Sequence, residues 1–440
     1  MGAKVSTTDL SPKAKKTIGI VFFTLFLDLI GFSIIFPMFP AVAKHYLTHD
    51  PDNYFLKIIF NAISNLTHQS GSEMSTIVLF GGILGALYAV LQFFAAPFWG
   101  SLSDRFGRKP ILMISIFGLC ASYILWIFAG SFTLLIIARF IGGIMGGNLS
   151  VATAVVADVT NESNRSKGMA FVGIAFAFGF IFGPALGGFL TLYNPMDSFP
   201  ELVKFGLNPF SYAALLAGIL SLVNLIILFF KFEETLDIKK QKVQHRSSNI
   251  IKLFTPLKDR NINYVNYVYF LFILAFSGME FNLTFLAVER FNYSSMQNAY
   301  MFIFIGFIIA IVQGGFIRRR AHDIGEKKVA LIGMSIIIPG LFTIAYASSE
   351  FTLYLGLFFL SVGSACAIPT LTALVSLLTS QSEQGRSLGI FRALGSLGRV
   401  FGPIMASVLY WKMGSTIPYV LGGVSIILPL LILIRVDDQP

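Results

Sequence analysis

Charged residues are scarce in this sequence. Asp, Glu, Lys and Arg make up 12% of the 440 residues, whereas a typical soluble protein has about 25%. Hydrophobic residues account for 55% of the chain, and the mean hydropathy is +0.76. Because a soluble fold of this size could not hide so much apolar surface, the composition predicts a polytopic membrane protein.

Motifs for ATP, metal or redox chemistry are also missing. The chain has no Gly-Lys dipeptide, so it lacks the G-x-x-x-x-G-K-[ST] phosphate loop, and it has no H-E-x-x-H segment. Its two cysteines, Cys120 and Cys366, lie within apolar runs, where we expect inert core thiols. We therefore expect no metal, no cofactor and no enzyme activity, and a gradient rather than ATP as the energy source.

What is present is a series of long apolar runs. A membrane helix needs about 17–25 apolar residues. On that rule the sequence predicts about twelve spans in two sets of six, at roughly 17–40, 76–99, 110–130, 132–157, 166–190 and 210–230, then 263–288, 296–317, 329–347, 351–378, 387–410 and 416–434.

The distribution of basic residues predicts the orientation. The net charge is +10, but the basic residues are scattered over short loops, which indicates topology and not nucleic-acid binding. With the N-terminus inside, five of the 32 Lys and Arg residues fall outside, three fall in spans, and the remaining 24 are cytoplasmic. We predict that both termini are cytoplasmic.

The polar segment 231–262 divides the chain. We predict an N-terminal six-helix bundle over 1–230, a cytoplasmic linker over 231–262 and a C-terminal six-helix bundle over 263–440. The linker either lies on the membrane face or binds a partner. An internal repeat supports the two halves, since Gly183-Pro184 recurs as Gly402-Pro403 and Gly142 recurs as Gly363.

A long outside loop is predicted over 41–75. It carries His45, His49 and His68. Their irregular spacing favours a solvated loop over a metal site.

A short charged turn separates the second and third runs. It reads Gly100-Ser-Leu-Ser-Asp104-Arg105-Phe-Gly107-Arg108-Lys109, and we call it the gate loop. Its glycines permit a tight reversal, and its cations hold the reversal on the cytoplasmic side. It resembles, at every diagnostic position, the G-x-L-x-D-R-x-G-R-K loop of the major facilitator superfamily.

Other segments resemble the drug:proton antiporter branch of that superfamily. Arg139-Phe-Ile-Gly142-Gly143 is similar to its R-x-x-q-G element, although Gly142 stands where Gln is usual. Gly179-Phe-Ile-Phe-Gly183-Pro184-Ala-Leu-Gly187-Gly188 is similar to its G-x-x-x-G-P-x-x-G-G pattern. The first span, with Asp28-Leu-Ile-Gly31, looks like that of tetracycline exporters.

The second half is most similar to another part of this branch, the vertebrate tetracycline-transporter-like organic-anion exporters. The segments that carry this likeness are Ser277-Gly-Met-Glu280-Phe281, Gln313-Gly-Gly315 and Arg392-Ala-Leu-Gly395-Ser-Leu-Gly398-Arg399 with Gly402-Pro403.

The resemblance implies a fold and a mechanism. We expect an all-α major facilitator fold, with twelve transmembrane helices in two pseudo-symmetric six-helix bundles around a central cavity, acting as a monomer. Asp104, Arg105 and Arg108 would latch the cytoplasmic gate, with Asp104 at the positive end of a neighbouring helix in one state; the alternative is a topological anchor. The glycine-proline segments of spans 5 and 11 would act as hinges or serve helix packing alone.

Five ionisable residues fall inside spans. They are Asp28, Arg139, Glu280, Arg392 and Arg399. A charge at the bilayer centre costs roughly 2.5–3.5 kcal/mol, so these side chains should face a wet cavity or each other. Asp28 and Glu280 are proton-coupling candidates, or else hydrogen-bonded structural carboxylates.

The arginines are candidates for charge pairing or substrate binding. Arg139 is the natural partner for a cavity carboxylate. Arg392 and Arg399 share one face of span 11, where they form an anion clamp or neutralise Glu280. Two acidic and three basic groups in the spans favour an anionic or zwitterionic substrate.

The sequence therefore predicts a proton-coupled antiporter of the cell membrane. It would export small amphipathic organic compounds, drugs or organic anions, by alternating access, with the bilayer and protons as its other partners. A lipid or lysophospholipid translocator and a solute importer of the same fold remain alternatives, and a transport-dead receptor is a more remote one.

Overall fold

The structure is a computed structural model that describes residues 10–65, 73–160, 165–236, 257, 259–379 and 384–437. Within these ranges every regular element is a helix. Twelve helical segments are long and apolar enough to cross a bilayer. The predicted all-α fold with twelve spans is therefore confirmed.

The first six spans form the first half of the molecule. Span 1 comprises α1, η1 and α2, span 4 comprises α6, η2 and α7, and the other four are α4, α5, α8 and α10. The elements of this half are α1 (Pro12–Ser33), η1 (Phe36–Met38), α2 (Phe39–His49), α3 (Tyr54–Asn65), α4 (Glu73–Phe106), α5 (Arg108–Ile127), α6 (Phe132–Met145), η2 (Gly146–Asn148), α7 (Leu149–Asp158), α8 (Arg165–Leu190), α9 (Pro195–Ser198), η3 (Pro200–Phe205) and α10 (Ser211–Lys231).

The second half follows the same plan. Its spans are α11, α12 with η5, α14, α15, α16 and α17. The elements are α11 (Arg260–Phe291), α12 (Ser295–Ile311), the π-helical turn η5 (Val312–Ile317), α13 (Arg318–Ile324), α14 (Glu326–Ala345), α15 (Glu350–Leu378), α16 (Gln384–Met413) and α17 (Thr416–Ile434).

Short polar residues start several of these helices. The hydroxyl of Ser294 accepts the Gln297 N–H while the Gln297 side chain accepts the Ser294 N–H, and Ser349 and Thr352 form the same arrangement. The Asp259 carboxylate accepts the backbone N–H groups of Asn261 and Ile262 at the start of α11. These caps fix where apolar runs become helices.

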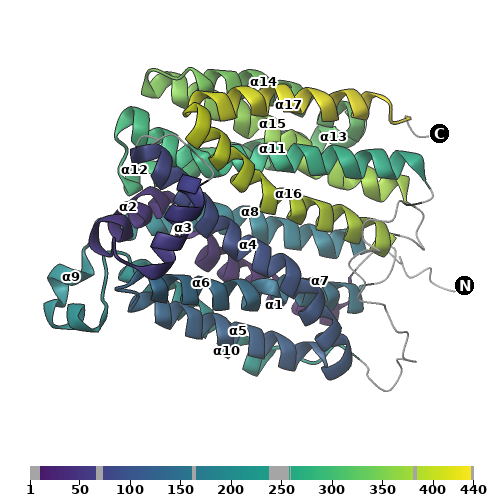
Figure 1. Ribbon diagram of the computed structural model, residues 1–440. Coiled ribbons are helices and arrows are strands. Elements are labelled where there is room, and N and C mark those ends of the chain that lie inside the picture. Colours follow the sequence, from purple (N-terminus) through teal and green to yellow (C-terminus); the bar gives the residue numbers. More distant parts are fainter. Residues whose placement is uncertain are drawn as a thin grey trace, which may run out of the picture.

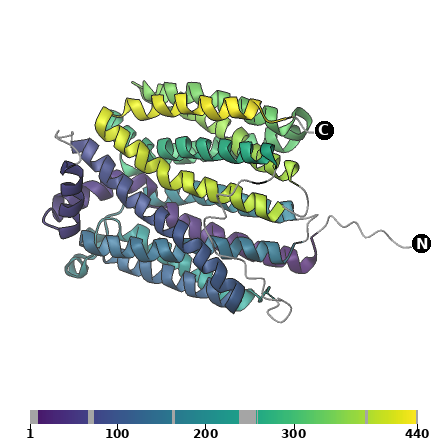
Figure 2. The same cartoon turned by 45° about the vertical axis from the view of Figure 1, so that its right-hand side comes forward.

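The two halves lie side by side (Figures 1 and 2). In the first half α1 packs on α8 and α10, and in the second α11 packs on α16 and α17. Across the boundary α4 packs on α16 and α8 packs on α12. The described chain begins and ends at one end of the bundle, which we call the termini end, and α2, α3 and α9 lie at the opposite end (Figure 1).

The halves meet closely towards the opposite end. A Cβ on Gly82 of α4 would overlap Ser407 of α16, and one on Gly188 of α8 would overlap Ala299 of α12. There the Asn298 side chain donates a hydrogen bond across the boundary to the Pro37 carbonyl, at 3.2 Å. Small residues thus let the two backbones approach.

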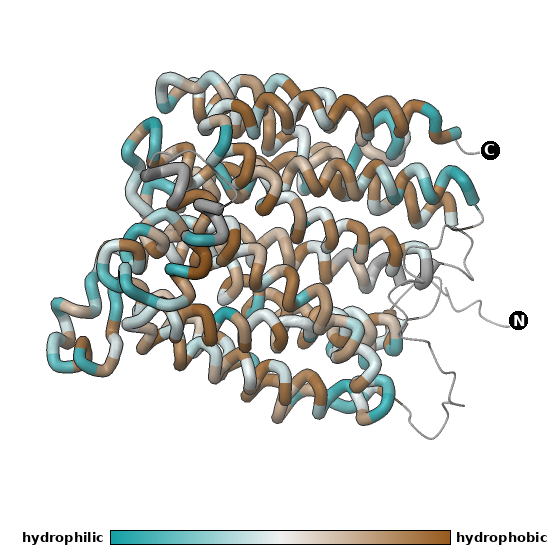
Figure 3. The backbone as a smooth tube through the Cα atoms, viewed as in Figure 1, coloured by the Kyte–Doolittle hydropathy of each residue, from teal (hydrophilic) through white to brown (hydrophobic). Residues whose placement is uncertain are grey.

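Hydropathy changes from the ends of the bundle to its middle. Figure 3 shows hydrophilic segments gathered at the two ends of the bundle and hydrophobic ones along its middle. This is the distribution that a bilayer requires.

Residues 41–65 differ from the predicted loop. Span 1 continues through η1 and α2 to His49, and α3 follows from Tyr54. Pro37 and Pro40 stand in the first turns of η1 and α2. The backbone N–H groups of a first turn have no partner within the helix, so proline is tolerated there. These prolines therefore begin helical segments and do not end the span. The prediction of a solvated loop was wrong for this stretch, and residues 66–72, including His68, lie outside the described residues.

Candidate functional site

Asp28 lies in the last third of α1, near the middle of span 1, and is held by two amides. The Asn148 side chain in η2 donates to Oδ2 at 2.7 Å, and the Asn224 side chain in α10 donates to Oδ1 at 2.9 Å. Among the residues described, no basic side chain forms an ion pair with Asp28. The acid therefore joins spans 1, 4 and 6 through neutral hydrogen bonds.

Arg139 occupies a different place in the first half. Its guanidinium carbon stacks 3.9 Å from the centre of the Trp126 ring, and its side chain is buried. Nε and Nη2 have no hydrogen-bond partner. Among the described residues no carboxylate forms an ion pair with Arg139, so its pairing with a cavity carboxylate stays a prediction.

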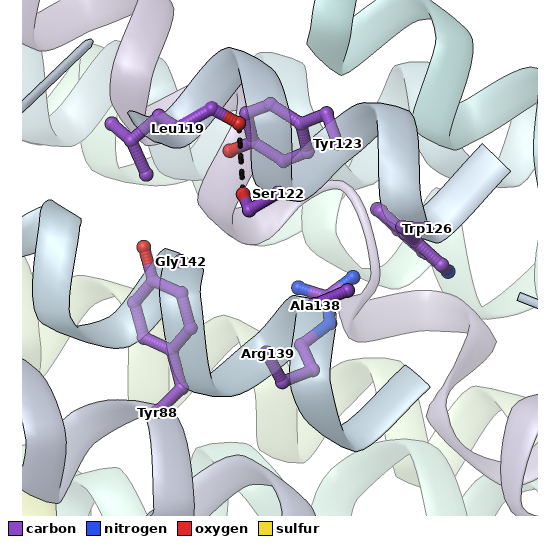
Figure 4. Close-up of a pocket in the computed structure, with 8 residues that line it drawn as sticks. All are labelled: Tyr88, Leu119, Ser122, Tyr123, Trp126, Ala138, Arg139 and Gly142. Carbon is purple, nitrogen blue, oxygen red and sulfur yellow. Dashed lines mark hydrogen bonds between the residues drawn. The ribbon is translucent and has the colours of Figure 1, made fainter. Parts of the chain in front are cut away.

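A small cavity lies beside this guanidinium. It has a free volume of about 10 Å³, enough for about one water molecule. Figure 4 shows that the Arg139 side chain points towards α5, which carries Ser122 and Tyr123, and that Tyr88 of α4 also lines this cavity. Tyr88 and Tyr123 interact electrostatically with both Arg139 and Asp28, so these tyrosines connect the two charged groups.

The second half gathers its two span-11 arginines around one tyrosine. Arg399 and Arg392 of α16 both act on the hydroxyl of Tyr269 of α11, whose ring centre lies 3.8 Å from that of Phe391. Arg399 also interacts electrostatically with Glu280 of α11. The structure thus groups both arginines in one cluster, with Glu280 coupled to it through Arg399, and all three charged side chains are partly buried.

Aromatic rings join this cluster to the first half. Arg399 lies over the ring of Phe180 in α8, 5.5 Å from its centre. Phe180 contacts Phe32 of α1, with ring centres 6.0 Å apart, and Phe32 contacts Tyr88 at 4.9 Å. A continuous aromatic surface therefore runs from the surroundings of Asp28 to Arg399.

The predicted hinge glycines form the tightest helix contacts of α8. A Cβ on Gly179 would overlap Leu29, one on Gly183 would overlap Ser33, and one on Gly187 would overlap the Ile34 carbonyl. The Ser33 hydroxyl donates to the Gly179 carbonyl at 3.0 Å. Gly188 faces α12 instead, across the boundary between the halves.

The second half repeats this joint. The Ser277 hydroxyl in α11 donates to the Gly398 carbonyl in α16 at 3.2 Å, and a Cβ on Gly402 would overlap Ser277. Pro184 and Pro403 directly follow the packed glycine in each half. The serine joint is the most direct structural counterpart of the sequence repeat.

The gate loop is a tight turn at the termini end. α4 ends at Phe106, Gly107 takes a φ of +101°, which favours glycine, and α5 begins at Arg108. Arg108 binds Asp104 at 2.6 Å and Asp158 of α7 at 2.8 Å. A Cβ on Gly100 would lie in ordinary van der Waals contact with Ser150 of α7.

The two other cations of the gate loop lie nearer the surface. Arg105 is exposed beside the ring of Phe106, 5.1 Å from its centre. Lys109 donates from Nζ to the Phe229 carbonyl of α10 at 2.9 Å. Asp104 pairs with Arg108 here and not with a helix end, so its latch role stays a prediction.

A different carboxylate covers the start of α5. Glu234, just beyond α10, accepts the backbone N–H groups of Arg108 and Lys109, both at 2.9 Å, and those of Thr235 and Leu236. Partial burial opposes its ionisation, but these four donors outweigh burial and hold the pKa of Glu234 below its usual range. The exit of span 6 is thereby fixed to the gate loop.

Metal ligands do not converge in the described part of the chain. The rings of His45 and His49 stack with centres 4.4 Å apart, and His49 Nδ1 lies 3.0 Å from the His45 carbonyl. Stacked rings do not aim their nitrogens at a common point, so this pair does not suit a metal ion.

Several neighbours of the charged groups were not singled out from the sequence. Asn148 and Asn224 are polar residues inside apolar runs, and the rule applied to the charges would have found them. Trp126, Phe180 and Tyr269 carry no such signal, because 15% of the chain is aromatic and most rings have no polar neighbour to mark them.

The fold and the site define a class of protein: a multi-pass membrane transporter with charged side chains buried among its spans. A model of the Major Facilitator Superfamily matches residues 21–325 and 320–440. The chain belongs to this superfamily, whose members here are transporters and not enzymes.

Individual relatives support the same assignment. Major facilitator superfamily domain-containing protein 10 of Mus musculus is 32% identical over 95% of this chain and 92% of its own length. Tetracycline resistance protein, class B, of Escherichia coli is 28% identical over 87% and 86%. The crystal structure of the human organic anion transporter MFSD10 (TETRAN) superposes with a TM-score of 0.76 at 31% identity, covering 96% of this chain and all of that one. A D-xylose-proton symporter shares the fold, with a TM-score of 0.73 at 17% identity over 97% and 98% of the two chains.

Proposed function

We propose that this transporter exports small amphipathic organic anions in exchange for protons, by alternating access, in the cell membrane with both termini in the cytoplasm. The observation that carries the proposal is how the buried charges are distributed between the two halves. In the first half Asp28 has no cation partner among the described residues, and in the second half the cluster of Arg392 and Arg399 has more positive than negative charge. The positive-inside distribution supports the orientation.

The proton side of the exchange rests on Asp28. A partly buried carboxylate that is bonded only to neutral amides is free to gain a proton without breaking an ion pair. Glu280 is the second candidate, but its charge is coupled to Arg399. Proton uptake there would therefore also release a cation for substrate.

The substrate side rests on Arg392 and Arg399. Two guanidinium groups lie near Tyr269, and only Arg399 also interacts with the carboxylate of Glu280, so the cluster has positive charge left to neutralise an anion. Phe180 and Phe32 offer aromatic surface next to it. An amphipathic organic anion matches both features, and one relative is named an organic anion transporter.

The movement would occur at the boundary between the halves, taken as residues 1–230 and 263–440 with 231–262 as linker. The close contacts at Gly82, Gly188 and Asn298 lie towards the opposite end. This supports movement about these contacts, in which the glycine-proline segments serve as hinges and the gate loop as a latch. The superfamily fold supports function as a monomer.

Everted membrane vesicles test the proposal directly. A candidate organic anion should collapse an imposed pH gradient through the wild-type protein, and Asp28→Asn should abolish this collapse while leaving counterflow of labelled substrate. Glu280→Gln should abolish it too. Coupling that survives both substitutions would refute the assignment of proton carriers, and transport without proton movement would refute antiport.

A further inference from the structure

The surroundings of Asp28 are built to control its proton. Asn148 is 4% exposed and Asn224 is fully buried, and both turn their N–H groups towards the carboxylate. Each amide bonds a different oxygen, so neither oxygen of the ionised acid lacks a donor. Hydrogen bonds to an ionised group contribute about 1.5–3 kcal/mol each and favour the ionised form.

The amide of Asn224 also contains an acceptor for the protonated acid. Its Oδ1 is buried and has no hydrogen-bond partner. A half-turn of the amide would present this oxygen to the O–H of a protonated Asp28. Besides its bond to Asp28, the Asn224 side chain would lose its bond to the Thr24 carbonyl at 3.2 Å, and this carbonyl keeps the helical hydrogen bond from the Asp28 N–H.

Few other groups compete for this control. The titratable side chains that face Asp28 are Tyr88 of α4 and Cys120 and Tyr123 of α5. Arg139 of α6 interacts with the two tyrosines. All four are neutral or cationic over the working range, so no second acid of these helices shares the proton.

The remaining helices against α1 carry their charges at the ends. Within α8 the only acidic or basic residues are Arg165 and Lys167 in the first turn, in α10 the only one is Lys231 at the last residue, and in α7 the only one is Asp158 at the last residue. Asp28 is near the middle of the bundle, so the two amides are its strongest polar contacts.

We propose that Asn148 and Asn224 are positioning residues that set the pH at which Asp28 exchanges its proton. The inference rests on the proposed role of Asp28 as a proton carrier. The two amides hold the acid ionised until protons are abundant, and protonation of either oxygen places a donor against the amide of span 4 or that of span 6, which reports the state of the acid to that span.

Infrared titration of the purified full-length protein in detergent tests this with protons as the only probe. The band of the protonated carboxyl that Asp28→Asn removes is followed against pH. Asn224→Leu and Asn148→Leu should each move its midpoint to higher pH by about one to two units, a 10- to 100-fold gain in proton affinity. Asn224→Ala and Asn148→Ala serve as smaller substitutions should the leucine variants not fold.

Asn266→Leu is the matched control. Asn266 is likewise a buried asparagine of a span, but it lies in α11. Its replacement should leave the Asp28 midpoint in place. A purely structural role of Asn148 and Asn224 predicts lower stability with an unmoved midpoint, and that result would overturn the inference.

The outcomes separate this inference from the proposed function. If Asp28→Asn leaves proton coupling intact in vesicles, the carrier assignment fails. If Asp28→Asn abolishes coupling but the amide variants titrate like the wild type, only the positioning role fails.

Discussion

The two halves of the molecule use the same joints but handle charge differently. Ser33 packs against Gly183 as Ser277 packs against Gly402. In the first half, however, the in-span charges stand apart, with Asp28 on two amides and Arg139 on Trp126. In the second half both arginines form one cluster around Tyr269, and Arg399 couples this cluster to Glu280.

The turns at the termini end also share their backbone conformation but differ in their polar contacts. Gly107 and Gly325 both take a positive φ before a span, and Lys109 and Lys327 each donate from Nζ to a carbonyl near the end of their half's last span. The carboxylate cap from Glu234 belongs to the first half. Backbone architecture is thus shared, whereas polar groups have diverged, as expected if one half exchanges protons and the other binds substrate.

The shared joint gives the largest expected effect. Gly183→Val and Gly402→Val should each destabilise the protein by about 3 kcal/mol or more, because the new side chain would overlap a serine of the facing helix. Both should lower the thermal unfolding midpoint in detergent by similar amounts. Gly173→Ala, where no atom lies within 4 Å of the new Cβ, is the control; a large loss in one half only would break the equivalence.

The arginine cluster gives the next effect. Arg392→Gln and Arg399→Gln should each weaken transport of organic anions about tenfold, equivalent to about 1.4 kcal/mol, by removing a charge-assisted contact. Uptake of cationic test compounds into everted vesicles should change little. Equal losses for anions and cations would show that these arginines only support the fold.

The Glu234 cap is expected to contribute about 1 kcal/mol. Because the pKa of Glu234 is lowered on folding, its stabilisation is complete above the unfolded value of about 4.5 and is lost as pH falls through the folded value. Glu234→Gln should flatten the acid side of a plot of unfolding midpoint against pH. Glu201→Gln, which replaces an exposed carboxylate of η3, should leave that slope largely unchanged.

Arg139 gives the smallest effect on stability. Arg139→Met should not lower the unfolding midpoint, because the buried guanidinium has two nitrogens without a hydrogen-bond partner, and their desolvation offsets the contact with Trp126. The thermal unfolding midpoints of the wild type and Arg139→Met, followed with a fluorescent dye that does not react with thiols, would measure this difference in stability. A fall of several degrees would show that Arg139 has an ionic partner in the working protein.

The sequence allowed the spans to be predicted because bilayer thickness constrains apolar length directly. The serine–glycine joint was foreseen only in part. Gly183-Pro184 and Gly402-Pro403 marked the repeat, but nothing marked Ser33 as the residue that packs on Gly183. The pairing of Arg139 could not be foreseen, because an aromatic partner is not distinguishable from the many other rings. The helices beyond Pro37 were missed because proline is ambiguous between ending one helix and starting the next.

The hydrogen bonds from the start of α5 to Glu234 also determine how the chain is anchored beyond α10. The covalent route to the second half departs from beside Arg108 and Lys109, not from the free tip of α10. A pull on the chain at Glu234 would therefore be borne by the start of α5, next to the reversal at Gly107, and not by α10 alone.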